Sequence, residues 1–166
     1  MRKPNPQSDA EIAYHLSNNL PRLLREFSRD FERRIWQQLA DRGYPDIRQS
    51  HGQVFANLGM GAVRVSELAE RAQVTQQAMG KMLKELEALG YITRATDPTD
   101  RRARDIRLTD TGVQLARDCL EVVDEVREYY AARVGARALV DLEAQLRETV
   151  RQLQLEYLPE SWTETR

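Results

Sequence analysis

The amino-acid sequence predicts a mainly α-helical chain that carries one small β-hairpin. Apolar residues recur every three or four positions from Ile12 to Leu39 and again from Val113 to Leu153, which is typical of amphipathic helices. Between these stretches the period changes to two, over residues 91–96 and 103–108, as in strands with one buried face. The 166 residues are 41% hydrophobic and 31% charged, a composition typical of a globular protein that argues against disorder.

The first helical segment is expected to begin at Ser8, which forms a capping-box pattern with Glu11. Pro21 either kinks one long helix or separates a short helix from a second one that begins near Asn19. A shorter helix is expected over residues 48–58. It is followed by a GMGA loop and by a short strand over residues 63–65.

Two short helices and a hairpin complete the middle of the chain. Ser66 is the expected N-cap of the first helix and Thr75 that of the second, with a tight turn at Gln73 and Val74 between them. Gly90 ends the second helix. After the hairpin, Thr109 caps a long helix that ends at Gly135, and a last helix follows.

The order helix, tight turn, helix, charged hairpin predicts a winged helix-turn-helix. On a helical wheel, the apolar residues of segment 76–89 share one arc of about 140°. These residues are Ala78, Met79, Met82, Leu83, Leu86 and Leu89. The opposite side is small, amide or basic: Gln77, Gly80, Lys81, Lys84 and Ala88. Glutamine can read adenine and lysine suits phosphates, so this face fits a DNA major groove; a merely solvated helix would tolerate the same residues.

The hairpin tip strengthens the DNA hypothesis. Arg101, Arg102 and Arg104 crowd the tip beside Asp97 and Asp100, and a narrow minor groove attracts inserted arginine. Asp100 could orient a neighbouring guanidinium group. Residues 71–107 hold eight basic and five acidic residues, a local charge of +3 in a chain of net charge −1, so the basic groups are concentrated here. Such a surplus fits a nucleic-acid footprint as well as an ordinary solvated surface.

The segment VSELAERAQVTQQAMGKMLKELEALGYITRATDPTDRRARDIRLTDTG, residues 65–112, resembles the MarR family of transcriptional regulators. The shared features are LAxxxxV[ST], LExxGY, a DxRR-like wing and LTxxG, and the resemblance extends from about Leu20 to Leu155. It implies a single unit over residues 1–166. Helices at about 8–45 and 110–158 would form a homodimer, and about 47–109 would form the DNA-binding lobe.

The same resemblance implies the site residues and their partners. Thr75, Gln76, Gln77 and Lys81 match recognition-helix contacts, and Asp100 and Arg102 match the wing acid and wing-tip arginine. Lys84, Arg101 and Arg104 are further expected DNA contacts, because their side chains are positively charged. The expected partner is double-stranded DNA with an inverted-repeat operator, bound by a repressor that a small molecule or an oxidant releases. Relatives often carry Gly in place of Gln73 and Thr-Arg in place of Gly80-Lys81, so the turn and the operator contacts are expected to differ here.

Three residues form the predicted effector pocket: Trp36, His51 and Phe55. The resemblance implies a small aromatic or phenolic ligand where the dimer helices meet the DNA-binding lobe. The alternative for His51 is a structural histidine with satisfied hydrogen bonds. Cys119 is expected to be a buried structural thiol rather than a redox sensor.

The remaining composition excludes several classes of function. The chain has one cysteine and two histidines, no apolar run of about 18 residues and no secretory signal. The sequence therefore predicts a cytoplasmic, non-membrane protein without a metal site, a cofactor or catalytic residues. The alternative to a DNA-binding regulator is a helical dimerisation or adaptor protein that uses its winged helix for protein contacts.

Overall fold

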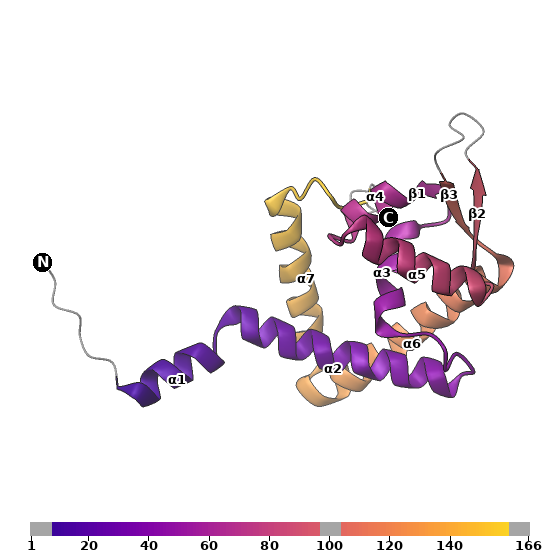
Figure 1. Ribbon diagram of the computed structural model, residues 1–166. Helices are drawn as coiled ribbons and strands as arrows, with labels where there is room; N and C mark the ends of the chain where they lie inside the picture. Colours follow the sequence, from indigo (N-terminus) through magenta and orange to yellow (C-terminus); the bar gives the residue numbers. More distant parts are fainter. Residues whose placement is uncertain (1–7, 97–103, 160–166) are drawn as a thin grey trace, which may run out of the picture.

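The computed structural model describes residues 8–96 and 104–159 of the chain. Its N-terminal part consists of two helices, α1 (Asp9–Ser17) and α2 (Leu20–Asp41). Asn19 caps α2 through its side chain and Pro21 lies in the first turn, so the proline separates two helices rather than kinking one. The capping box of Ser8 and Glu11 opens α1 as predicted. Helix α1 projects away from the body of the molecule (Figure 1) and buries no residue.

The central lobe begins with α3 (Gln49–Leu58), β1 (Val63–Arg64) and α4 (Val65–Arg71). The prediction that Ser66 caps α4 is wrong: the helix begins two residues earlier than predicted, at Val65, with Arg64 at the N-cap position. The reason is the sheet, because Val63 and Arg64 pair with Ile106 and Asp105 and the strand leads directly into the helix. After a tight turn, α5 (Gln76–Ala88) follows.

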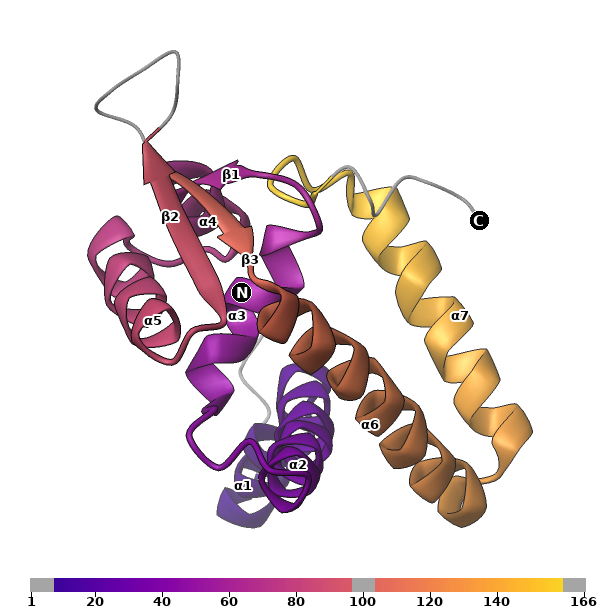
Figure 2. The same ribbon diagram turned by 90° about the vertical axis from the view of Figure 1, so that its right-hand side faces the viewer.

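A small antiparallel sheet flanks these helices, with strand order β1-β3-β2. Strands β2 (Ile92–Thr96) and β3 (Arg104–Leu108) form the predicted hairpin, in register from Ile92 opposite Leu108 to Thr96 opposite Arg104. Ile92 and Ile106 are buried, so one face of the hairpin packs on the core. Strands β2 and β3 lie side by side at one edge of the lobe (Figure 2).

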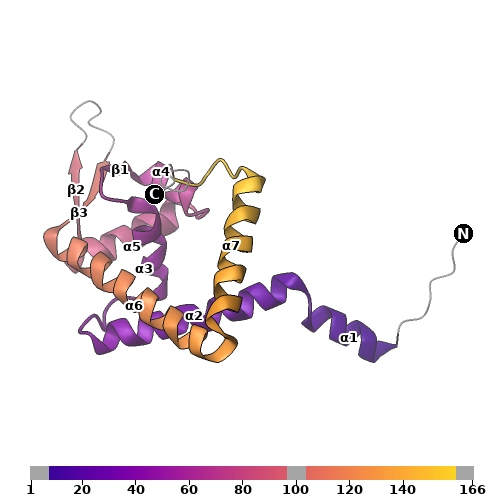
Figure 3. The ribbon, with the colours of Figure 1, turned by 180° about the vertical axis from the view of Figure 1, so that it is seen from behind.

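Two long helices close the chain, α6 (Asp110–Val134) and α7 (Ala136–Leu153). Thr109 caps α6 by accepting a hydrogen bond from the Gly112 backbone, as predicted. A Cβ atom at Gly112 would lie 2.0 Å from the Tyr91 carbonyl oxygen, so only glycine lets α6 start so close to the sheet. Gly135, at φ +96°, reverses the chain, and α7 contacts α6 and leaves the turn at an angle to it (Figure 3).

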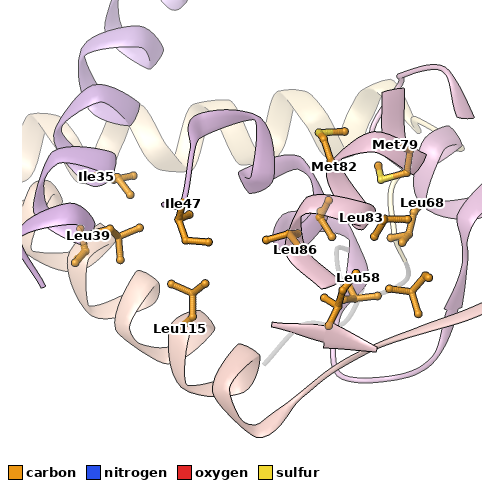
Figure 4. Packing of buried hydrophobic residues seen from close by; sticks show 14 of the residues in the cluster. Ile35, Leu39, Ile47, Leu58, Leu68, Met79, Met82, Leu83, Leu86 and Leu115 are labelled. Carbon is orange, nitrogen blue, oxygen red and sulfur yellow. The ribbon is translucent and has the colours of Figure 1, made fainter. Parts of the chain in front are cut away.

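One continuous core joins the lobe to the long helices. Figure 4 shows Leu39 and Leu115 at one end and Leu68, Met79 and Leu83 at the other, all of them at most 1% exposed. The apolar stripes that the sequence pattern placed on α2, α5 and α6 therefore face each other. This shared core connects α5, through the helices packed on it, to α2 and α6.

Apolar residues outside this core gather on α1, on the first half of α2 and on α7. They are exposed to between 38% and 71%: Ile12, Tyr14, Leu16, Leu20, Leu23, Leu24, Val140, Leu142, Leu146 and Leu153. Such a series is longer than the scattered apolar residues of an ordinary surface.

None of the helices in the described residues is long and apolar enough to cross a lipid bilayer. Within the same two ranges, no group of three or more His, Cys, Asp or Glu side chains lies where it could hold a metal ion.

Candidate nucleic-acid interface and ligand cavity

The turn between α4 and α5 fixes where α5 begins. Gln73 adopts the left-handed conformation, at φ +53°, where relatives often carry glycine. Its side-chain amide donates to the Glu70 carbonyl over 2.8 Å, and the Val74 backbone donates to Ala69. Thr75 accepts from the Ala78 backbone over 3.1 Å and so caps α5 as predicted. Hydrogen bonds before and after Gln73 thus hold the turn closed although the φ angle of Gln73 is unfavourable.

Helix α5 has one buried and one exposed face. Met79, Met82, Leu83 and Leu86 are at most 8% exposed and anchor it in the core. The predicted apolar arc is wrong at its two ends: Ala78 is exposed and Leu89 is 38% exposed. Both lie at the ends of the helix, where the core does not cover them, so the wheel overestimates the buried arc.

The outward face of α5 carries the predicted contact residues in an exposed row. Thr75, Gln76, Gln77, Lys81 and Lys84 are all exposed. A Cβ atom at Gly80 would meet nothing within 4 Å, so no neighbour within the protein requires this glycine. The structure therefore brings together, on one surface, the amide and basic groups that the sequence assigned to base and phosphate contacts.

The hairpin tip lies largely outside the described residues. Asp100, Arg101 and Arg102 belong to the segment 97–103, and only the backbone of Arg104 is described, at the start of β3. Two other basic residues of the predicted footprint are already paired: Arg94 with Glu87, at 3.0 Å, and Arg71 with Glu67. The basic surplus of this region is therefore carried by fewer side chains than the count suggested.

His51 lies behind α5 and is completely buried. Its Nδ1 atom accepts from the Arg48 backbone over 3.2 Å, which leaves the proton on Nε2 to donate to a Glu85 carboxylate oxygen 2.9 Å away. This hydrogen bond lowers the pKa of Glu85, with a smaller contribution from the positive charge of Arg48. Both ring nitrogens of His51 thus have hydrogen-bond partners, as expected of a structural histidine. The bond to Glu85 connects α3 to α5.

A cavity of about 750 Å³ lies between α2, α3 and α6. Trp36 and Phe55 line it, whereas His51 does not and instead borders a smaller hollow beside Glu85. The structure thus brings two of the three predicted pocket residues together and places the third on the other side of α3. Sequence reasoning missed most of the lining, which comes from all three helices and the loop before α3: Glu32, Ile35, Leu39, Ile47, Gln49, Ser50, Gly52, Gln53, Ala56, Leu115, Ala116, Cys119 and Leu120.

Two residues that line this cavity, Trp36 and Cys119, carry a polar group. The indole Nε1 of Trp36 is buried without a hydrogen-bond partner among the described residues. Cys119 is half-buried, and burial raises the pKa of its thiol, which makes it less reactive than an exposed cysteine. The lining is otherwise mostly apolar, which suits an apolar or aromatic compound.

Comparison with known proteins extends these observations. The MarR family model matches residues 46–103, which run from the loop before α3 to the hairpin. The exopolysaccharide II synthesis transcriptional activator ExpG of Rhizobium meliloti is 30% identical over 96 residues, which cover 58% of this chain and 50% of that protein. The chain thus aligns with half the length of this relative.

Solved structures match a larger share of the chain. The reduced form of MarR from E. coli has a TM-score of 0.71 at 20% identity and covers 80% of this chain and 96% of its own. The transcriptional repressor CouR, bound to a 23-mer DNA duplex, has a TM-score of 0.64 at 21% identity, with coverage of 82% and 95%. The matched family and its structural neighbours are transcription regulators, not enzymes. Residues 46–103 therefore match the MarR family model, and the chain shares the helical fold of the solved MarR structures.

Proposed function

We propose that this chain is a homodimeric transcriptional regulator that binds double-stranded DNA at an inverted repeat. The observation that carries the proposal is the outward face of α5, an exposed row of amide and basic side chains backed by buried methionine and leucine residues. A helix anchored in this way can enter a major groove without unfolding its support. Its likeness to a repressor solved on a DNA duplex supports this role.

Each side chain of this face has a proposed role. Gln76 and Gln77, in the first turn of α5, are the base-reading residues, with Thr75 beside them on a base edge or a phosphate. Lys81 and Lys84, one and two turns further on, contact phosphates. Arg101, Arg102 and Arg104 enter the minor groove, with Asp100 orienting one guanidinium group, a role that rests on their sequence alone.

The exposed apolar residues of α1, α2 and α7 support a homodimer. Leucines on α2 and α7, including Leu23, Leu142 and Leu146, have no full cover within the described chain. A second copy presents the same surface and would bury both, as in isologous dimers. Two recognition helices would then reach successive major grooves about one helical turn apart.

The cavity supports regulation by a small molecule. Its volume of about 750 Å³ is within the range of ligand sites, and Trp36 and Phe55 offer aromatic surfaces for a small aromatic or phenolic effector. A ligand that prefers one spacing of the recognition helices would shift the dimer away from DNA, which is the behaviour of a repressor released by its effector. A cytoplasmic location belongs to the same proposal, because the chromosomal DNA lies there.

Selection of bound duplexes from a random pool, at about 150 mM salt, tests this function directly. The expected result is enrichment of an inverted repeat whose half-sites are about one helical turn apart. Absence of enrichment, with recovery of a stable protein partner instead, would favour an adaptor that uses its winged helix for protein contacts. Placing the selected repeat upstream of or across a promoter then distinguishes activation from repression.

A further inference from the structure

The two faces of α3 have different neighbours. Gly52, Phe55 and Ala56 line the cavity, whereas His51, Val54 and Leu58 are at most 2% exposed and face the interior of the lobe. Because α3 is a single ten-residue helix, a displacement of its cavity face also displaces its inner face. Helix α3 therefore lies between the proposed effector and the proposed DNA-reading helix.

The contact between α3 and the cavity wall is very close. A Cβ atom at Gly52 would lie 2.7 Å from Cζ2 of Trp36, so the indole ring packs directly on the α3 backbone. Trp36 cannot move towards α3 without pushing it. An occupant that pushes this ring towards α3 consequently shifts α3.

The contact between α3 and α5 is made by a buried polar pair. His51 has no exposed surface, and both of its ring nitrogens are bonded, to the Arg48 backbone and to Glu85. Apolar contacts let helices slide, but a hydrogen bond buried on one side fixes a distance and a direction. Glu85 lies one helical turn after Lys81 on α5, so the bond acts close to the DNA-facing residues.

We propose that His51 is a positioning residue, which makes α5 follow α3 through the bond to Glu85 while α3 follows the contents of the cavity. The proposal rests on the proposed function for its effect on DNA binding, but not for the movement itself. His51 therefore acts behind the effector site and not as one of its ligands.

Cys119 offers a way to fill the cavity without knowing the effector. It lines the cavity and is the single cysteine of the chain. Benzyl methanethiosulfonate reacts with its thiolate at about pH 8.5. The sulfur of Cys119 forms a disulfide with the benzylthio group, methanesulfinate leaves, and the thiol proton passes to the buffer. Dithiothreitol reverses the modification, and the unreactive Cys119→Ser variant is the control.

The experiment follows the backbone amide resonances of α5 and the affinity for a selected duplex, with and without the benzylthio group. In the unsubstituted protein we expect the resonances of Lys81 and Lys84 to shift and the affinity to fall about tenfold or more, both reversibly. His51→Asn retains an acceptor for the Arg48 backbone but is too short to reach Glu85. In this variant we expect both responses to fall below about a quarter of their size.

Two further variants guard against a simple folding defect. His51→Gln is long enough to donate to Glu85 and should keep the response. Glu85→Ala removes the same hydrogen bond by changing its half-exposed partner, and this variant should lose the response. If His51→Asn and Glu85→Ala respond as strongly as the unsubstituted protein, the proposal is wrong. If the α5 resonances respond but no duplex is bound, the positioning role stands and the proposed DNA-binding function fails.

Discussion

The outward face of α5 and the apolar surface of α1, α2 and α7 are both exposed, yet their charges are arranged differently. Most of the arginines on α2, α6 and α7 are paired with nearby carboxylates, such as Arg22 with Glu26 at 2.8 Å and Arg127 with Glu143 at 2.7 Å. On α5, neither Lys81 nor Lys84 forms an ion pair within the described ranges. The helices thus neutralise their own charges around apolar residues, as expected of a surface that meets a copy of itself. The face of α5 keeps its cations available for an anionic partner.

The largest effect is expected from a charge placed on the apolar surface. Leu142→Asp combined with Leu146→Asp would bury two carboxylates per protomer in the proposed dimer interface, so the dimer should dissociate. Losing the second half-site should weaken binding to an inverted repeat more than 100-fold. Sedimentation and DNA titration measure both effects. Ala144→Asp adds a carboxylate to the opposite, exposed side of the same helix and should change neither; an intact dimer in the double variant would refute the interface.

A smaller effect is expected when one base-reading side chain is removed. Gln77→Ala should weaken binding to the selected repeat by about 1–3 kcal/mol and leave binding to random duplex nearly unchanged, because only base contacts depend on sequence. Competition titrations with the two duplexes measure this ratio. An equal loss on both duplexes would instead make Gln77 a backbone contact.

The internal charge pairing of the long helices should appear in the pH dependence of stability. Hydrogen bonds from Tyr130, Arg33 and Arg34 hold the pKa of Asp30 well below its ordinary value. The ionised carboxylate therefore stabilises the fold at neutral pH, and this contribution is lost as the pH falls below about 4. Asp30→Asn should lower the Tm at pH 7, and the difference from the unsubstituted protein should shrink towards pH 3.

Asp41→Asn is the matched control for this measurement, since among the described residues the Asp41 side chain accepts a hydrogen bond only from Gln37, on its own helix. It should change the Tm little at either pH. A Tm difference for Asp30→Asn that grows on acidification would contradict the assigned role.

The smallest effect concerns the turn that supports α5. Gln73→Gly relieves the left-handed backbone angle at the cost of some chain entropy, so the free energy of unfolding should rise by up to about 1 kcal/mol. Ala72→Gly, at a residue with an ordinary helical angle, should lower it instead. Urea denaturation compares the two variants, and a destabilised Gln73→Gly would show that the side-chain bond to Glu70 outweighs the backbone strain.

Local patterns in the sequence predicted most of the fold, because capping residues and apolar periods act over a few positions. Thr75, Thr109 and the Ser8 capping box lie where predicted, whereas Ser66 does not cap α4, since pairing of Val63 with a strand 43 positions away decides that boundary. The cavity is a similar case. Helical spacing marks Leu115 and Trp36 as apolar-face residues, but only the packing of three helices shows that they face the same space while His51 does not.

The salt dependence of DNA binding tests the central claim most directly. If a dimer contacts about eight phosphates, the slope of log affinity against log salt for the selected duplex should be about −7. Lys81→Ala with Lys84→Ala removes two of the proposed phosphate contacts from each protomer, so the slope should fall to about −4 while the Tm stays nearly unchanged. A double variant with the slope of the unsubstituted protein would contradict the claim that the outward face of α5 contacts DNA.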